Sequence, residues 1–112
     1  MKKIEAILRP ESIGAVRDSL GFAGVTGLMI SEIEGHGKQK GIVQQWRGEK
    51  YRVELLPKVK IEVVVRDKDV ERICNVIIQS ARTGEIGDGK IFVYPVEEAI
   101  RIRTGEKGDG VL

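Results

Sequence analysis

The sequence predicts an α+β fold made of two strand–helix–strand halves joined by a long connection. Alternating apolar and polar residues mark the strands, and apolar stripes at helical spacing lie between them. The periodicity disappears over about twenty residues in the middle of the chain, from Gly35 to Leu55, and a connection of that length is generally functional or disordered.

The first half contains a strand over residues 2–9, where apolar and charged side chains alternate until Pro10 ends the pattern. A helix follows, which Ser12 is placed to cap and whose end Gly21 and Gly24 mark. Its apolar face consists of Ile13, Val16, Leu20 and Ala23. The next strand is predicted over residues 28–33.

The second half repeats this order. A strand over residues 58–65 alternates cleanly, and a helix begins at Asp67 or Asp69. The apolar stripe of this helix consists of Val70, Ile73, Cys74, Ile77, Ile78 and Ala81. The second half ends with a glycine-rich turn, a strand over residues 91–96 and a short alternating segment that ends at Arg103.

Two such halves predict the ferredoxin-like βαββαβ sandwich, with both helices on one face of an antiparallel sheet. The other sheet face carries apolar Ile7, Val64 and Phe92, and the sequence holds no further helix to cover them. Self-association of the chain is the simplest way to cover this second sheet face. Residues 1–112 form a single domain, whose tail from residue 105 to residue 112 is expected to be mobile.

The composition indicates a soluble globular protein, with 41% hydrophobic and 32% charged residues. A net charge of +2 does not by itself indicate nucleic-acid binding, so any basic site must be local. The single cysteine, Cys74, excludes an intramolecular disulfide and suits a reducing compartment. With no secretory signal and no apolar run of about 20 residues, a cytoplasmic location is expected.

The segment Gly84-Glu85-Ile86-Gly87-Asp88-Gly89-Lys90 is the strongest candidate for a binding site. Closely spaced glycines let consecutive backbone N–H groups face one anion, and the lysine adds a positive charge. The segment differs from a Walker A loop, because Ile91 stands where the magnesium-binding hydroxyl belongs and a strand follows. A simple turn whose glycines serve only for positive φ remains an equal alternative on this segment alone.

Two further segments favour a polyphosphate ligand. Arg101 and Arg103, if they lie in a strand, point the same way and suit bidentate phosphate contacts. A solvated strand edge is the favoured explanation when the pair stands alone. The segment Gly35-His36-Gly37-Lys38-Gln39-Lys40 is another glycine pair followed by bases. His36 has no neighbouring acid or cysteine and is expected to be an ordinary loop residue.

No catalytic set is evident, because no serine or cysteine has an identifiable base and no carboxylate pair stands out. Cys74 lies on an apolar stripe and is expected in the core. Trp46 and Tyr51 lie among bases in the long connection, which indicates a docking element.

The chain as a whole resembles the PII signal-transduction family of nitrogen regulators. The most specific part is the stretch from Ala81 to Val93 (ARTGEIGDGKIFV), which is similar to the C-terminal signature of that family. Residues 1–7, 39–41, 56–62 and 100–106 carry supporting matches.

The resemblance implies a homotrimer with inward-facing sheets and three clefts between subunits, where ATP and ADP compete. It also implies that Arg101 and Arg103 reach the nucleotide from the neighbouring subunit. The ligand-binding set implied for one subunit is Ile7, Met29, Gly35, Gly37, Lys38, Gln39, Lys40, Lys58, Gly87, Asp88, Gly89, Lys90 and Phe92.

The resemblance further implies that 2-oxoglutarate binds with Mg-ATP, where Gln39 coordinates the magnesium ion and Lys58 meets a 2-oxoglutarate carboxylate. Residues 37–55 correspond to the T-loop, which changes shape with ligand state and docks on targets. The implied targets include ammonium transporters, adenylyltransferases and amino-acid kinases, with membrane contact only through a transporter and no nucleic acid.

Four positions depart from the family pattern. Met29 replaces a common threonine near the adenine, and Lys38 replaces a common arginine and loses its bidentate geometry. Glu49 removes a serine that some relatives phosphorylate. Tyr51 is retained as a possible uridylylation site, although the segment Trp46–Tyr51 around it is altered.

Acylphosphatases and some RNA-binding modules share the ferredoxin-like architecture and are two alternative functions. An acylphosphatase needs a glycine-rich cradle with an arginine near the first strand and an asparagine that positions water, and no such motif follows residues 4–9. An RNA-binding module stacks bases on aromatics of its central strands. The chain has only two phenylalanines and two tyrosines and no basic-aromatic motif of that kind.

Overall fold

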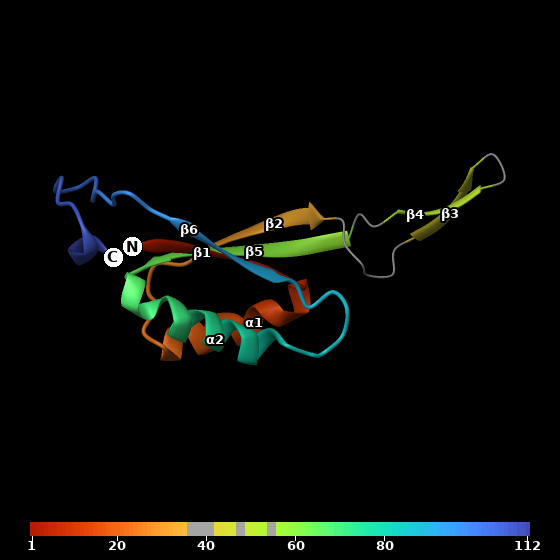
Figure 1. Ribbon diagram of the computed structural model, residues 1–112, viewed down its shortest axis with the longest axis horizontal. Helices are drawn as coiled ribbons and strands as arrows, with labels where there is room; N and C mark the ends of the chain where they lie inside the picture. Colours follow the sequence, from red (N-terminus) through yellow and green to blue (C-terminus); the bar gives the residue numbers. More distant parts are fainter. Residues whose placement is uncertain (36–41, 47–48, 54–55) are drawn as a thin grey trace.

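Two helices cover one face of a four-stranded antiparallel sheet, as Figure 1 shows for the computed structural model of the chain. The structure describes residues 1–35, 42–46, 49–53 and 56–112. The main sheet consists of β1 (Lys2–Leu8), β2 (Met29–Gly35), β5 (Leu56–Val65) and β6 (Lys90–Pro95), in the order β2-β5-β1-β6. The helices are α1 (Ile13–Phe22) and α2 (Val70–Ala81). This order confirms the predicted ferredoxin-like sandwich.

The core lies between the helices and the sheet because the strands alternate as the sequence predicts. In β1 the side chains of Ile4, Ala6 and Leu8 are buried, while those between them are only half-buried. Helices α1 and α2 contribute apolar side chains at helical spacing. The buried core cluster consists of Ile4, Ala6, Leu8, Val16, Leu20, Ile61, Val63, Val65, Ile73, Ile77 and Ala81. Cys74 is half-buried against this cluster, and burial raises the pKa of its thiol.

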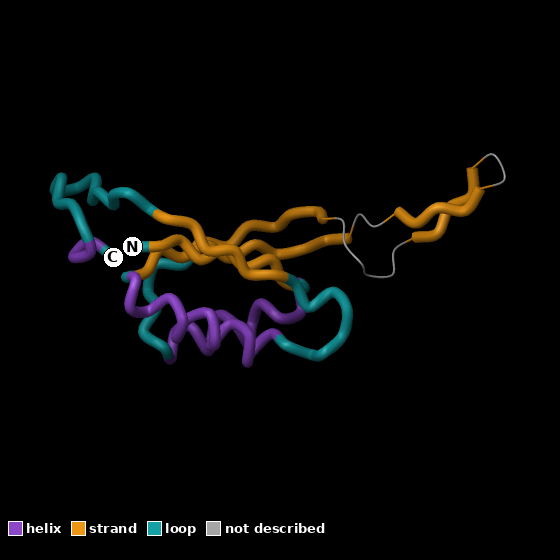
Figure 2. The backbone as a smooth tube through the Cα atoms, in the orientation of Figure 1, coloured by secondary structure: helices purple, strands orange, loops and turns teal. Residues whose placement is uncertain are grey.

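The other sheet face combines apolar residues with an ion-pair network. The Lys3 ammonium lies 3.6 Å from a Glu5 carboxylate oxygen and 3.4 Å from one of Glu62, and Lys60 lies 3.4 Å from the other oxygen of Glu62. Phe92, on the same face, is 44% exposed. Neither helix covers this face, which is the face predicted to need a second layer (Figure 2).

The long connection contains more regular structure than its lack of periodicity indicated. Strands β3 (Ile42–Trp46) and β4 (Glu49–Val53) pair antiparallel in a separate two-stranded sheet, with Ile42 opposite Val53 and Trp46 opposite Glu49. Both strands are rich in β-branched and aromatic residues, which favour extended backbone even where apolar and polar residues do not alternate.

The start of α1 differs from the capping predicted for Ser12, whereas α2 begins directly after Asp69, one of the two predicted starts. A 3₁₀ turn, η1 (Pro10–Ser12), precedes α1, and the Ser12 side chain makes no cap hydrogen bond; its backbone N–H donates to Arg9 O at 3.0 Å instead. A second 3₁₀ turn, η2 (Asp67–Asp69), precedes α2 in the same way. In both cases the 3₁₀ hydrogen bond replaces the side-chain cap.

The segment after β6 folds back as a turn and not as the predicted strand. An isolated bridge joins Ile100 to Lys107, and the chain ends in a 3₁₀ turn, η3 (Asp109–Val111). The Gly108 N–H donates to Ala99 O at 3.0 Å. This segment therefore has a defined path, while the mobility expected for residues 105–112 stays a prediction.

The packing of Ile61 gives a direct test of this core. Ile61 is fully buried on the central strand β5, whereas Ile102 is 100% exposed. Ile61→Ala is expected to lower the free energy of unfolding by about 2–5 kcal/mol, because it removes packed methylenes and leaves a cavity. Ile102→Ala, the matched control, should change it by less than about 0.5 kcal/mol. Urea unfolding at one fixed protein concentration measures both, and equal effects would contradict the assigned core.

Candidate functional site

The glycine-rich loop between α2 and β6 is shaped by three glycines with positive φ. Gly84, Gly87 and Gly89 have φ values of 88°, 103° and 109°, which favour glycine. Gly89 has a second requirement, because a Cβ atom there would lie 1.8 Å from the carbonyl oxygen of Ile7. Only glycine allows the loop to approach β1 this closely, so the loop is held against the end of the central strand.

The Asp88 carboxylate braces the loop from within. One oxygen accepts the N–H groups of Thr83 and Gly84, each at 2.9 Å, and the other accepts the Thr83 hydroxyl. Hydrogen bonds from the Thr83 hydroxyl and backbone hold the pKa of the Asp88 carboxyl below its usual value. Because this side chain is occupied and negative, only the backbone of Asp88 is suited to meet a phosphate.

Arg9 clamps the same loop from the end of β1. Its Nε donates to Gly87 O at 3.1 Å and its Nη2 donates to Ile86 O at 2.6 Å. Its Nη1 lies 3.4 Å from the Thr83 hydroxyl oxygen and 3.7 Å from an Asp88 carboxylate oxygen. Sequence reasoning missed Arg9, which it treated only as the last alternating residue of a strand; the signal was a cation directly before Pro10, where the strand must end.

The carbonyl groups and the N–H groups of the loop therefore face in opposite directions. The carbonyls of Ile86 and Gly87 face the Arg9 guanidinium. In the described part of the chain, the N–H groups of Gly87 and Gly89 donate to no protein acceptor. Lys90 follows directly and is exposed. Backbone N–H groups beside a lysine form a site that suits an anion.

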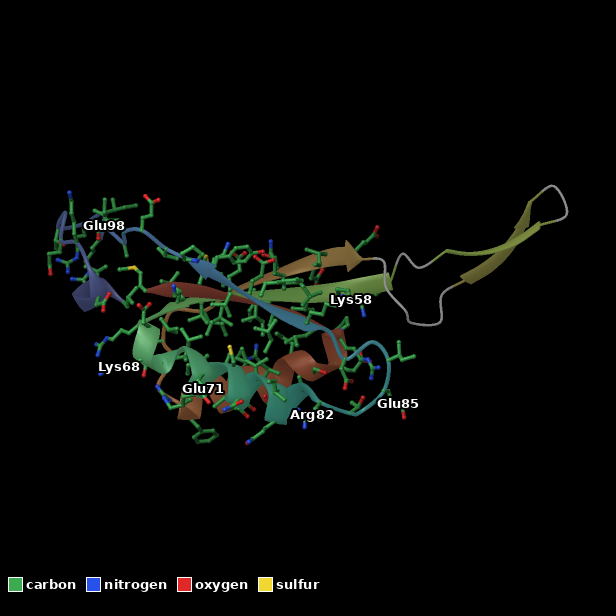
Figure 3. The ribbon with its side chains drawn as sticks, in the orientation of Figure 1. Lys58, Lys68, Glu71, Arg82, Glu85 and Glu98 are labelled. Atoms are coloured by element: carbon green, nitrogen blue, oxygen red, sulfur yellow. The ribbon has the colours of Figure 1, made fainter. Side chains whose placement is uncertain are left out.

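Lys58 adds a third cation at this end of the sheet, as Figure 3 shows. It is 8% exposed and lies opposite Ile33 of β2. Burial and the positive charge of Arg9 lower the pKa of the Lys58 ammonium, against an opposing effect of Glu11. No carboxylate of the described residues lies within ion-pair distance of Lys58, so this partly dehydrated ammonium is suited to a negatively charged ligand.

A second group of predicted residues lies elsewhere. Met29 and Arg101 line a hollow of about 760 Å³, formed by the loop after α1, the last residues of β5 and the C-terminal turn. Figure 2 shows this end of the molecule opposite the loop that joins α2 to β6. Figure 3 gives the same separation, since Glu98 lies at one end and Lys58 and Glu85 at the other. One chain does not bring the two groups together.

The predicted strand geometry of Arg101 and Arg103 is wrong. Arg101 O accepts the Gly105 N–H at 2.7 Å, and Arg101 N–H donates to Glu106 O at 2.8 Å, so these residues enclose a tight turn. The positive φ of Gly105, 73°, makes this turn possible. Arg101 Nη1 lies 3.1 Å from a Glu106 carboxylate oxygen, and the two arginines do not share one strand face.

The remaining predicted residues divide between described and undescribed parts. Ile7 lies directly opposite Lys90, and Phe92 lies opposite Glu5 in the same strand pair. Gly35 is the last residue of β2, and Tyr51 lies on β4. The predictions for His36, Gly37, Lys38, Gln39 and Lys40 lie outside the described residues.

The structure gives little support to the two other functions. The glycine-rich loop follows α2 and not β1, unlike an acylphosphatase cradle. Phe92 and Tyr94 lie on the edge strand β6, while the central strands β1 and β5 carry no aromatic residue. Among the described residues, no group of three or more His, Cys, Asp or Glu side chains could hold a metal ion, and no helix is long and apolar enough to cross a membrane.

Comparison with known proteins assigns the chain to a family. The family model described as "Nitrogen regulatory protein P-II" matches residues 1–106. The chain belongs to the P-II family. It is 56% identical over 112 residues to the nitrogen regulatory protein P-II of Azospirillum brasilense and 55% identical to that of Rhodospirillum rubrum, with both chains fully covered in each case. It is 52% identical over 108 residues to the nitrogen regulatory protein P-II 2 of Methanothermobacter thermautotrophicus, covering 96% of this chain and 94% of the relative.

Membership confirms the family resemblance and supports a role in nitrogen signal transduction. The relatives are named as regulatory proteins, and membership in the family supports regulatory interaction with target proteins. Those names do not state which ligands or targets the relatives bind, or how many subunits they form.

The close approach of Gly89 to β1 predicts a graded response to alanine. Gly84→Ala should cost roughly 1–2 kcal/mol, because φ is positive but the space is open. Gly89→Ala adds a backbone clash to the same strain and should cost clearly more. Urea unfolding of the two variants at equal concentration tests this, and equal costs would show that the loop does not press against Ile7.

Proposed function

We propose that this P-II protein is a non-catalytic regulator that binds ATP or ADP in clefts between the subunits of a homotrimer and binds 2-oxoglutarate together with Mg-ATP. The observation that carries the proposal is the division of the site into two groups at opposite ends of one chain. The anion-binding loop lies at one end, and the hollow lined by Met29 and Arg101 lies at the other.

The separation between the two groups favours a site shared by neighbouring subunits. Gly89 precedes β6, and Arg101 comes several residues after it. The six residues of β6 alone span about 20 Å. A cyclic arrangement that sets the loop of one subunit beside the hollow of the next joins the two groups, and each chain then contributes to two clefts. The same arrangement lets subunits cover one another's open sheet faces.

The proposed contacts follow from the chemistry of each group. The N–H groups of Gly87, Asp88 and Gly89 and the ammonium of Lys90 meet phosphate oxygens, and Met29 lies at the adenine. Arg101 and Arg103 approach from the neighbouring subunit. Ile7 and Phe92 supply the apolar surface beside the phosphates. Gly35, Gly37, Lys38, Gln39 and Lys40 complete the site according to the family resemblance.

The metabolite site is proposed beside the phosphates. Lys58 is the buried cation suited to a carboxylate of 2-oxoglutarate, and Gln39 is the proposed magnesium ligand. When bound beside the phosphates, the ion would supply positive charge that attracts the carboxylates of 2-oxoglutarate, so binding of the metabolite would depend on the nucleotide.

The signal is proposed to leave through the connection between β2 and β5. Gly35 and Lys58 stand near its two ends, and the β3–β4 hairpin lies between them. A ligand that contacts both ends shifts the conformational population of the segment by its differential affinity. The segment from residue 37 to residue 55 then docks on a target, such as an ammonium transporter, an adenylyltransferase or an amino-acid kinase, and Tyr51 is a candidate for uridylylation.

Mixed trimers give a test of the shared cleft. Lys90→Ala and Arg101→Ala should each weaken ATP binding in calorimetry, because each removes a cation from the phosphates. Co-refolding the two variants in equal amounts should restore about one quarter of the sites, since a random trimer places an intact loop beside an intact Arg101 at that frequency.

The refolded single variants are the controls and should recover no sites. If the mixed sample also recovers none, while both variants are trimeric, the two residues serve the same subunit and the shared cleft is wrong. Normal ATP affinity of Lys90→Ala would remove the phosphate assignment itself.

Binding of 2-oxoglutarate gives a separate test of Lys58. Wild-type protein should bind 2-oxoglutarate with Mg-ATP present and not without it. Lys58→Gln should lose this binding and retain ATP, whereas Lys60→Gln should retain both, because Lys60 lies on the same strand face but pairs with Glu62. Equal 2-oxoglutarate binding by the ligand-free protein would contradict the coupling.

A further inference from the structure

We infer that Arg9 is the positioning residue of the glycine-rich loop, and that it orients the loop amides toward the ligand by holding the opposite carbonyls. The inference rests on the proposed function for the identity of the ligand, but the ordering of the loop can be measured without any ligand.

The Arg9 guanidinium holds the loop at two points. Arg9 Nε and Nη2 donate to two successive carbonyls, those of Gly87 at 3.1 Å and Ile86 at 2.6 Å. These bonds join positions 77 and 78 residues apart in the chain. A planar guanidinium with several donors in a fixed arrangement can hold two acceptors at once, which a lysine ammonium does less well.

The contacts of Arg9 set the direction of two peptide groups in the loop. The N–H and C=O of one peptide unit point in opposite directions. Fixing Ile86 O therefore fixes the N–H of Gly87, and fixing Gly87 O fixes the N–H of Asp88. With φ near 103°, the backbone at Gly87 has no preference strong enough to set this orientation by itself. The Arg9 guanidinium therefore fixes the peptide orientation that the backbone of Gly87 does not fix by itself.

The charge of Arg9 is balanced within the loop by Asp88. Asp88 lies 3.7 Å from Arg9 Nη1 and also accepts three hydrogen bonds from Thr83 and Gly84. Arg9 is thereby connected to both the start and the end of the loop. Its guanidinium faces loop carbonyls and a carboxylate, so its effect on a phosphate is exerted through the loop and not by direct contact. Loop order before binding lowers the cost of binding.

The experiment compares Arg9→Gln and Arg9→Lys with Arg17→Gln, in the full-length trimer. Arg17 is an exposed α1 residue, so its replacement changes the net charge equally without touching the loop. Two quantities are measured: amide hydrogen exchange over residues 84–89 without ligand, and affinity for Mg-ATP by calorimetry.

For Arg9→Gln, exchange of the hydrogen-bonded Gly84 and Glu85 amides should rise about tenfold or more, because the contacts to Asp88 and Thr83 open when the loop loses its order. ATP affinity should fall about tenfold or more, because the loop amides are no longer pre-oriented. Arg9→Lys keeps the charge but not the fork, and should remain defective in both measurements. Arg17→Gln should match wild type in both.

The competing outcomes are distinct. If Arg9→Lys restores ATP affinity while the loop stays disordered, the role of Arg9 is its charge and the positioning role is wrong. Unchanged loop exchange in both Arg9 variants also overturns it. If Arg9→Gln does not fold, Arg9→Lys still decides between these outcomes. If wild type binds no ATP but Arg9→Lys raises loop exchange, the proposed function fails and the positioning role stands.

Discussion

The two-sided pairing of β1 is the constraint on which both the fold and the candidate site depend. β1 pairs antiparallel with β5 along one edge and with β6 along the other, so its register decides which residues of three strands share a face. The same register places Ile7 opposite both Lys60 and Lys90. Arg9 follows directly after the strand, and Gly89 directly precedes β6. The glycine-rich loop is therefore positioned by the same pairing that buries the core.

The fold could be predicted from the sequence because its signals are local and repeated. The alternation in β1 and β5 and the stripe of α2 each bury one face, and a ferredoxin-like order is the simplest way to combine them. The family resemblance supported the same answer from separate motifs. The β3–β4 hairpin was missed because its residues indicate extended backbone only through their type, without the alternation that a half-buried face produces.

The candidate site could be predicted only in part, for a different physical reason. The glycines and Lys90 are contiguous, so a motif reveals them. Arg9 acts on the loop across 74 to 78 residues of sequence, and no spacing rule connects them. The arginine pair near the C-terminus was misjudged because a two-residue spacing implies a shared face only in a strand. Gly105, with its positive φ, turns the chain between them and Glu106.

The distribution of charge explains how the open sheet face and the site can coexist in one small protein. In the middle of the open sheet face, the carboxylates of Glu5 and Glu62 neutralise Lys3 and Lys60. At the loop end, Lys58 has no ion pair among the described residues and Lys90 is exposed. The cations that could bind a polyphosphate are thus separated from those that maintain the sheet. A ligand that neutralised Lys58 and Lys90 would leave the ion pairs of the sheet unchanged, so the proposed nucleotide site could fill without loosening the fold that carries it.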